Sequence, residues 1–407
     1  MGRASALALL LLSTHAWTAD TERAVAFNET GIRHLLSSRP DAAVTDFEEA
    51  LKLRPESRVL QRNLAAALSL RGRAHSEAKR LSQALVDFER AVELHPERLR
   101  YRHLRGETRL GLGGDGNRLY AREDFQWVLE RDPDYYPTLI YLASMDYADR
   151  RLQSCVQLYD RALVLQADNP KVQAARDKAA RELAVEERYE TVRDRNFVVR
   201  YSPDIPRDVA EAVLGFCDDA YVKLTRELDT VPHKVTVVTL YPRGDFRSAT
   251  RTHGWVGGLY DGTIRISMPG RRNPESVRGT LTHEFCHLLV HGITPRVPRW
   301  LDEGLAERAE GESVAASRAR LSRQARPKLA ELDGHALRGS DRASARRFYD
   351  LALAFTHFLH ERGGERGMLD LLRALGSGRQ PEAAVEAVYG RTLAQVFEAF
   401  VATLAEG

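Results

Sequence analysis

The residues HEFCH (283–287) form an HExxH motif, and WLDEGLAE (300–307) follows it after a short gap. Residues four apart on an α-helix lie one turn above each other on the same face, so His283 and His287 can direct their imidazoles at one point. Glu303, sixteen residues after His287, can add a carboxylate from a following helix. Two histidines and a carboxylate that leave a fourth position open are the ligands of a catalytic zinc site. The sequence therefore predicts one zinc ion per chain on these three side chains.

The residues around the motif favour a helix. Apolar residues keep a helical spacing before and after it, and Gly292 followed by Pro295 is a helix stop signal. His291 lies on the same face near the helix end, where we expect it to support the site or face solvent. The longer pattern HExxHxxGxxH is excluded, because Val290 and Ile293 stand where that pattern has Gly and His.

A resemblance to a known family rests on five stretches of the second half of the chain. They are NFVVRY (196–201), GGLYDGTI (257–264), HEFCH (283–287), PRWLDEGLAE (298–307) and YDLALAF (349–355). From about Asn196 to its C-terminus, the chain resembles the gluzincin metallopeptidases, in particular the bacterial peptidase-MA-like domain.

The resemblance implies roles for residues around the predicted zinc. Glu284 would be the general base, and Glu307 a carboxylate that accepts the other ring N–H of a ligand histidine and so fixes the orientation of its ring. The family often has Asn or Asp before its glutamate ligand, and here that residue is Asp302. Attack of water on a peptide carbonyl gives a tetrahedral intermediate with a negatively charged oxygen, and a hydrogen-bond donor is needed to stabilise it. The resemblance implies that Tyr349 is this donor. His253 and Tyr260 stay as rivals, and each of the three could equally be a packing or surface residue.

A substrate platform is expected just upstream of the motif. Residues 233–241 are typical of a buried strand, and residues 257–267 predict a strand pair that turns at Asp261 and Gly262. In resembling enzymes such a strand forms the sheet edge beside zinc, where a peptide can add as a further strand. The candidate substrate-binding residues are Gly258, Leu259 and Tyr260. A plain hairpin with flexible glycines is the alternative.

Composition indicates a globular protein of two domains. The chain has 407 residues, 43% hydrophobic and 29% charged, with a net charge of +3. Basic and acidic residues are mixed, so no nucleic-acid partner is indicated. Arg342, Arg346 and Arg347 are separated by small residues, which favours a solvated helix face over a binding patch.

Residues 1–19 are typical of an export signal. A short basic start precedes an apolar run at 6–12 that is too short to span a membrane, and cleavage could follow Ala16 or Ala19. The mature protein is therefore expected in the periplasm or outside the cell without a membrane span, and an uncleaved anchor is the alternative.

The chain has three cysteines, so they cannot all pair within the chain, and no disulfide framework is predicted.

The first half of the chain repeats itself. The pattern Ala43, Phe47, Ala50 and Pro55 recurs from Ala84, Ala121 and Cys155, with offsets of 41, 37 and 34 residues. The third copy has Val128 at the second small position, and the fourth has Ala167 in place of the proline. The last offset equals the tetratricopeptide period, and Gly31 takes the small position of that motif's first helix. The longer offsets imply insertions, for which 71–79 and 111–117 are candidates.

The expected fold is multidomain, with an all-α tetratricopeptide solenoid followed by an α+β gluzincin metallopeptidase domain. We expect about four repeats over 20–189 and the peptidase-MA-like domain over 190–407. The repeats would bind a protein partner or the substrate, or else only cap the neighbouring domain.

The export signal and the family resemblance together indicate an exported zinc-dependent metallopeptidase, in which the resemblance implies that Glu284 assists the attack of zinc-bound water on a peptide bond. One alternative is an inactive peptidase-like scaffold that binds proteins through its repeats. Another is an aminopeptidase, in which Asp261 or Glu275 could hold the free amine of the substrate.

Overall fold

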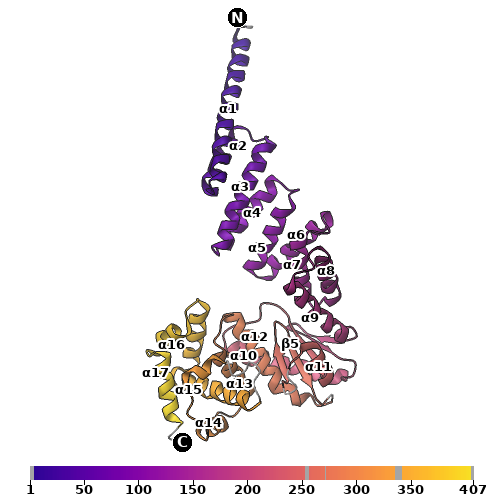
Figure 1. Ribbon diagram of the computed structural model, residues 1–407, viewed down its shortest axis with the longest axis vertical. Helices are drawn as coiled ribbons and strands as arrows, with labels where there is room; N and C mark the ends of the chain where they lie inside the picture. The colour runs from indigo at the N-terminus through magenta and orange to yellow at the C-terminus, as the bar shows by residue number, and fades with distance from the viewer. Residues whose placement is uncertain (1–3, 253–255, 271, 335–341, 405–407) are drawn as a thin grey trace. The chain divides into compact units, whose positions relative to one another are not determined.

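The computed structural model describes residues 4–252, 256–270, 272–334 and 342–404, with side chains from residue 19 onward (Figure 1). The chain divides into two compact units, Met1–Ala179 and Ala180–Gly407. The units meet ten residues before the boundary expected at 189/190.

The first unit consists of helices that pair in chain order (Figure 1). They are α1 (Ala4–Leu36), α2 (Pro40–Leu53), α3 (Arg58–Glu77), α4 (Leu81–Leu94), α5 (Leu99–Leu112), α6 (Asp115–Arg131), α7 (Tyr136–Ala148), α8 (Leu152–Leu165) and α9 (Pro170–Glu186). Residues 4–19, expected to be an export signal, form the start of α1. Within the described residues, no helix has the length and apolarity needed to cross a bilayer.

A glycine–aromatic contact recurs in the first three helix pairs. In each pair a glycine of the first helix lies under a fully buried phenylalanine of the second, so that an added methyl group would approach the ring within 3 Å. The distance from such an added methyl group to the ring would be 2.7 Å for Gly31 and Phe47, 2.9 Å for Gly72 and Phe88, and 2.7 Å for Gly106 and Phe125. This close approach of paired helices is the packing that a tetratricopeptide array requires.

The insertion of the second repeat lies in a different place from the one expected. Gly72 and Phe88 keep the sixteen-residue spacing of Gly31 and Phe47, so residues 71–79 hold no extra residues. The added length instead extends the start of α3, which has 20 residues where α5 has 14. In the third repeat, Gly106 and Phe125 are three residues further apart, and the 17-residue α6 begins at Asp115, inside the expected 111–117 segment.

The second unit is built on a five-stranded sheet of order β1-β2-β3-β5-β4. The strands are β1 (Glu190–Arg193), β2 (Phe197–Tyr201), β3 (Thr236–Pro242), β4 (Gly258–Tyr260) and β5 (Ile264–Met268). β2, β3 and β5 are parallel, and the outer strands β1 and β4 are antiparallel to their neighbours. The predicted strand at 233–241 corresponds to β3, and the predicted pair at 257–267 to β4 and β5. β4 is therefore an edge strand.

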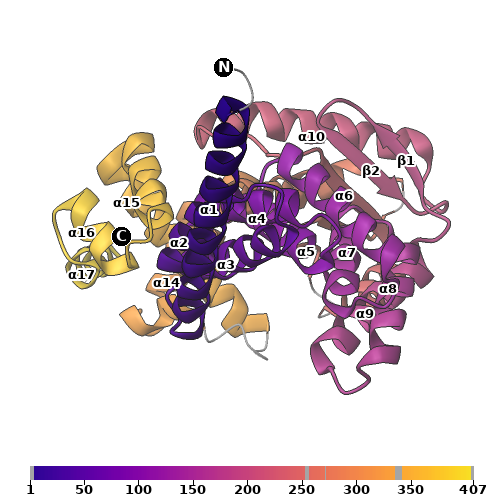
Figure 2. The same ribbon diagram turned by 90° about the horizontal axis from the view of Figure 1, so that it is seen from above.

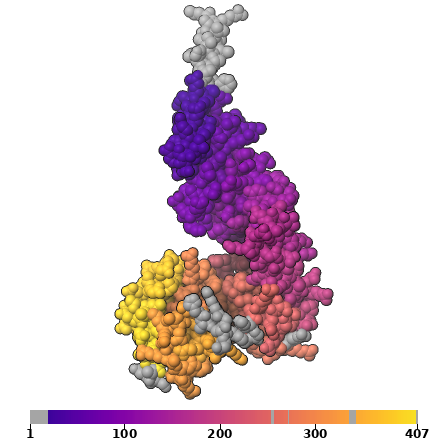
Figure 3. Space-filling model, in the orientation of Figure 1, coloured from indigo at the N-terminus to yellow at the C-terminus, as the bar shows by residue number. Residues whose placement is uncertain are grey.

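Helices cover this sheet and extend the unit. They are α10 (Arg207–Glu227), α11 (Arg243–Thr250), α12 (Arg278–Ile293), α13 (Arg299–Glu310), α14 (Val314–Ser322), α15 (Arg342–Gly376), α16 (Pro381–Tyr389) and α17 (Leu393–Thr403), with short 3₁₀ turns at Pro274–Val277 and Leu329–Asp333. α12 packs on β4 and β5, and α13 packs between α12 and α15. α15 is interrupted at Gly364, which has a positive φ of 62° that glycine adopts without strain. α15, α16 and α17 group together (Figure 2), and their C-terminal residues, in yellow, form one block of surface (Figure 3).

A buried arginine explains where the second unit begins. Arg265 on β5 has a side chain only 1% exposed, and its guanidinium pairs with Glu182 at 3.0 Å and Glu186 at 3.6 Å, both from the end of α9. Asp261 adds a third carboxylate at 3.1 Å. A buried charge needs such partners, so the last turns of α9 belong to the second unit.

Candidate metal centre

α12 and α13 bring the three predicted ligands together. His283 and His287 lie one turn apart on α12, and Glu303 reaches them from the first turns of α13. One oxygen of Glu303, Oε2, is 3.6 Å from Nε2 of His283 and 3.6 Å from Nε2 of His287. Donor atoms of the three side chains all lie within 4.8 Å of one another, as one shared ion requires.

A glycine fixes the position of the carboxylate. Gly304 follows Glu303, and a methyl group there would lie 2.1 Å from Oγ1 of Thr356 and 2.4 Å from the carbonyl oxygen of Ala352 on α15. α13 is therefore pressed against α15 at the residue beside the third ligand. Because the interior is close-packed, this contact holds Glu303 toward α12.

Carboxylates orient both imidazoles. Nδ1 of His287 is 2.8 Å from Oδ1 of Asp302, and Nδ1 of His283 is 3.0 Å from Oε2 of Glu310. With each Nδ1–H donating to a carboxylate, each Nε2 points to the side of Glu303, where its lone pair could bind a metal that replaces its proton. His291 supports the arrangement, because its Nε2 is 2.8 Å from the other oxygen of Asp302.

In the structure, Glu310 and not Glu307 accepts the ring N–H of His283. The nearest oxygen of Glu307 is 3.9 Å from Nδ1 of His283, beyond hydrogen-bond length, and its Oε2 is buried with no hydrogen-bond partner among the described residues. Glu310, one turn further along α13, makes the contact. Sequence reasoning missed Glu310, although its seven-residue spacing from Glu303 places it on the same helix face.

The charges of the site suit a cation. Burial lowers the pKa of His287, but the hydrogen bonds and charges of Asp302 and Glu303 outweigh it and raise that pKa to about 10. Burial raises the pKa of Glu303, and the two histidines reverse this and hold the pKa well below its usual value. In the protein without metal, protons on the imidazoles thus balance the carboxylates. A divalent ion can replace those protons, and the nitrogen and oxygen donors are those that zinc accepts.

We predict that Glu310→Gln weakens zinc binding by about 10- to 100-fold, the usual effect of losing a partner that orients a ligand. The amide cannot accept the imidazole N–H as strongly as a carboxylate. Glu307→Gln is the matched control and should weaken binding less, because its oxygen is 3.9 Å from the same nitrogen. Competition with a chromogenic chelator measures both affinities. A larger loss with Glu307→Gln would reverse our assignment.

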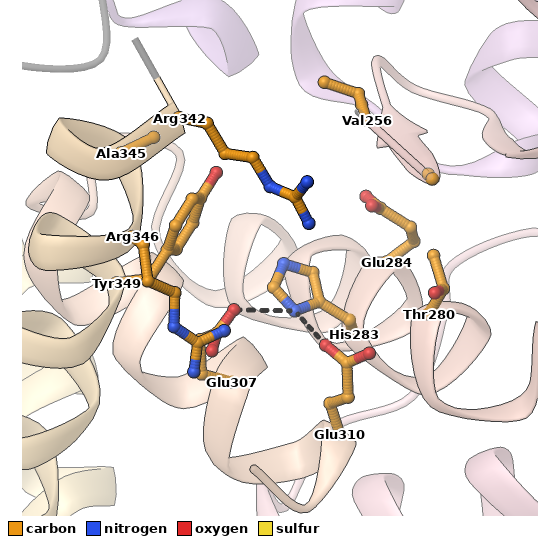
Figure 4. A pocket seen from close by; sticks show the side chains of 12 residues that line it. Val256, Thr280, His283, Glu284, Glu307, Glu310, Arg342, Ala345, Arg346 and Tyr349 are labelled. Carbon is orange, nitrogen blue, oxygen red and sulfur yellow. Dashed lines mark hydrogen bonds and ion pairs between the residues drawn. The ribbon is translucent and has the colours of Figure 1, made fainter. Parts of the chain in front are cut away.

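Glu284 lies on the opposite side of His283 from Glu310, lining a cavity of about 290 Å³ (Figure 4). Its side chain is 6% exposed, and burial raises its pKa to about 7. A carboxyl group with this pKa can both accept and donate a proton near neutral pH.

Tyr349 enters the same cavity from α15 (Figure 4). Burial and the negative charges of Glu303 and Glu307 raise its pKa above the ordinary value, so it keeps its proton and can donate a hydrogen bond. Of its rivals, Tyr260 packs edge-on against His291, with ring centroids 5.7 Å apart. His253 lies outside the described residues.

Of the three residues expected to bind substrate, Gly258 lines the cavity, and Leu259 and Tyr260 are not among the residues that line it. Leu259 packs against a cluster that includes Phe246, and Tyr260 packs against the main core. The backbone of β4 still forms the edge of the sheet beside α12.

We predict that Gly258→Ala lowers peptide hydrolysis by about 100-fold while zinc stays bound, since a misplacement of about 1 Å can cost this much. The added methyl group would lie 2.5 Å from Oε1 of Glu284 and displace it. Gly257→Ala is the matched control, because its methyl group would meet Thr280 at an ordinary 3.7 Å. Steady-state kinetics on both variants makes the comparison. Equal rates would mean that Glu284 tolerates displacement.

Two arginines expected on a solvated helix face line this cavity instead. Arg342 stands two turns before Tyr349 on α15 and Arg346 one turn before it, and both enter the cavity with it (Figure 4). Their spacing of four and seven residues places them on one helix face, which is the signal that could have found them. Arg347 turns away and pairs with Glu331 at 2.8 Å.

Comparison with known protein families agrees with the second part of the chain. Residues 218–405 match the family model of the peptidase MA superfamily, and no curated protein matches the chain. A tetratricopeptide repeat protein from Parabacteroides merdae is 10% identical, with 82% of this chain and 99% of that chain covered and a TM-score of 0.34. Pseudomonas aeruginosa PilF is 20% identical, with 42% and 93% covered and a TM-score of 0.27.

A repeat protein from Thermus thermophilus is 19% identical, with 39% of this chain and 98% of that chain covered and a TM-score of 0.23. The repeat assignment rests on the helix pairs and glycine–aromatic contacts of this chain. The family match likewise agrees with the HExxH helix and its carboxylate partner. The chain thus has the architecture of a tetratricopeptide-repeat array followed by a metallopeptidase-like C-terminal domain, which matches the peptidase MA superfamily over residues 218–405.

Proposed function

We propose that this protein is a zinc-dependent metallopeptidase that hydrolyses peptide bonds at the site of His283, His287 and Glu303. The convergence of these donors beside a buried glutamate carries the proposal. When bound, zinc would polarise the scissile carbonyl and lower the pKa of a coordinated water to about 7.

The protein's own residues supply the proton transfers and the orientation of the substrate. Glu284 accepts the proton of the attacking water and returns it to the leaving amine, for which its pKa of about 7 is suited. The hydroxyl of Tyr349 donates to the developing oxyanion. The free edge of β4 takes the substrate backbone as an added strand and holds it across the cavity.

Hydrolysis of an unfolded protein substrate tests the proposal. The zinc-loaded protein should cleave it, a chelator should stop cleavage, and added zinc should restore it. A zinc-loaded protein that binds peptides without cutting any would support the inactive scaffold and overturn the proposal.

An aminopeptidase is the second candidate, and Glu307 is the observation that favours it. Glu307 lines the cavity, and its buried Oε2 has no hydrogen-bond partner in the described part of the chain, so it could receive the free amine of a substrate. The acids considered from the sequence are engaged elsewhere, Asp261 with Arg265 and Glu275 with Arg278 at 2.9 Å. Peptides with free and acetylated N-termini separate the two activities, because an endopeptidase cleaves both.

We also propose that the protein is exported and that its array holds a protein partner or the substrate. The basic and apolar start of the sequence supports export. N-terminal sequencing of protein from the periplasm or medium should give a start at residue 17 or 20. Intact Met1 in the membrane fraction would favour an uncleaved anchor.

A further inference from the structure

A second cavity continues from the metal centre. It has a volume of about 550 Å³ and shares Val256, Gly257, Thr280 and Arg342 with the first cavity. The two together form one groove that passes from His283 over the start of α12 to α11. A substrate bound for cleavage at the metal centre would place several further residues in this extension.

The extension is cationic. Its described walls contribute three guanidinium groups, from Arg243, Arg247 and Arg342, and no carboxylate. The acids that line the groove, Glu307 and Glu310 with Glu284, belong to the first cavity. The carboxylates of the groove therefore lie only at its metal end, beside Arg342 and Arg346, whereas the charged groups of the extension are all guanidinium groups.

Arg342 is the arginine shared by both cavities. Its side chain extends into the first cavity toward the side of Glu284 (Figure 4). In the described part of the chain, neither Arg342 nor Arg247 has an ion pair. Arg346 differs, because its guanidinium is held by Glu312 at 3.0 Å and Asp350 at 3.1 Å. The guanidinium N–H groups of Arg342 can therefore bind a ligand, whereas the guanidinium of Arg346 is already held by carboxylates of the protein.

We propose that this groove selects peptides with a carboxylate close to the scissile bond, which Arg342 binds, and that Arg247 favours further acidic residues on the same side. The inference rests on the proposed peptidase function and names its substrate class. A guanidinium binds a carboxylate through two parallel hydrogen bonds, which gives both affinity and orientation. Glu307 and Glu310 repel the same carboxylate from the other end, so the peptide has one favoured direction.

Two sources could supply the carboxylate, an Asp or Glu side chain or the C-terminus of the peptide. A set of matched peptides distinguishes them. One pair differs by Glu against Gln at each position near the cleavage site, and another by a free acid against an amide at the C-terminus. Binding is measured on the full-length, zinc-loaded Glu284→Gln protein, so that affinity is scored without hydrolysis.

The acidic peptide should bind about 10- to 100-fold more tightly than its neutral match, the range for a hydrogen-bonded charge. Arg342→Ala should remove this difference, and Arg342→Glu should reverse it in favour of a lysine peptide. Arg379→Ala, which removes an exposed arginine outside the groove, is the control and should keep the difference. Zinc content and thermal unfolding establish that each variant is folded, and Arg342→Lys should retain part of the preference.

Two results would overturn the inference. One is equal binding of acidic and neutral peptides, and the other is a preference that survives in Arg342→Ala. Competition by an oligonucleotide of equal charge, as strong as that of the peptide, would also overturn it in favour of a general anion groove. If the wild-type protein cleaves none of these peptides but the Arg342-dependent preference holds, the peptidase proposal fails and the carboxylate groove stands.

Discussion

Replacing Glu284 with glutamine is expected to lower peptide hydrolysis by roughly 100- to 10,000-fold, the usual contribution of general acid–base catalysis. The amide has the size of the carboxyl group but cannot accept the proton of the attacking water. Glu284 is not among the residues whose donor atoms converge as the zinc site. Zinc content should therefore remain one ion per chain, and initial rates with metal analysis of the same samples check both expectations.

Glu275→Gln is the control for the Glu284 variant. Its side chain is 64% exposed, pairs with Arg278, and lies outside the cavity, so the rate should not change. A Glu284→Gln protein that keeps its zinc and cleaves at the wild-type rate would contradict the proposed role of Glu284.

Replacing Glu303 with alanine is expected to weaken zinc binding by more than about 100-fold, beyond the loss caused by removing a partner that only orients a ligand. The change removes the carboxylate that lies 3.6 Å from both imidazole nitrogens. It also removes the negative charge that helps to raise the pKa of His287. Equilibrium dialysis against zinc measures the affinity, and hydrolysis should fall with metal occupancy.

Glu361→Gln is the control for the Glu303 variant, since Glu361 is 57% exposed on α15 and faces His357. It should bind zinc as the wild type does. Full zinc occupancy in Glu303→Ala would mean that the ion sits on other side chains, such as the nearby group of His287, His291 and Asp302.

The sequence predicted the parts of the site that depend on local spacing. His283 and His287 are four positions apart on one helix, and helical geometry alone places them on the same face. The strand pair around Gly262 also followed from local signals, since its turn residues and flanking pattern are contiguous in the chain.

Contacts fixed by tertiary packing were harder to predict. Glu307 and Glu310 both lie on the face of α13 that carries Glu303, and the crossing of α12 and α13 decides which of them meets His283. Two carboxylate partners of Arg265, Glu182 and Glu186, come from α9, about eighty residues earlier, and no local pattern links them to Arg265. The side chain of Arg342 likewise enters the cavity only because of where α15 packs, which the sequence around it does not show.

Location of the metal ion tests the central claim most directly. In a crystal grown with zinc, the anomalous signal should form one strong peak about 2.0–2.2 Å from Nε2 of His283, Nε2 of His287 and a carboxylate oxygen of Glu303. A zinc-saturated crystal with no peak at these three side chains, or with Glu303 turned away from both imidazoles, would contradict the account.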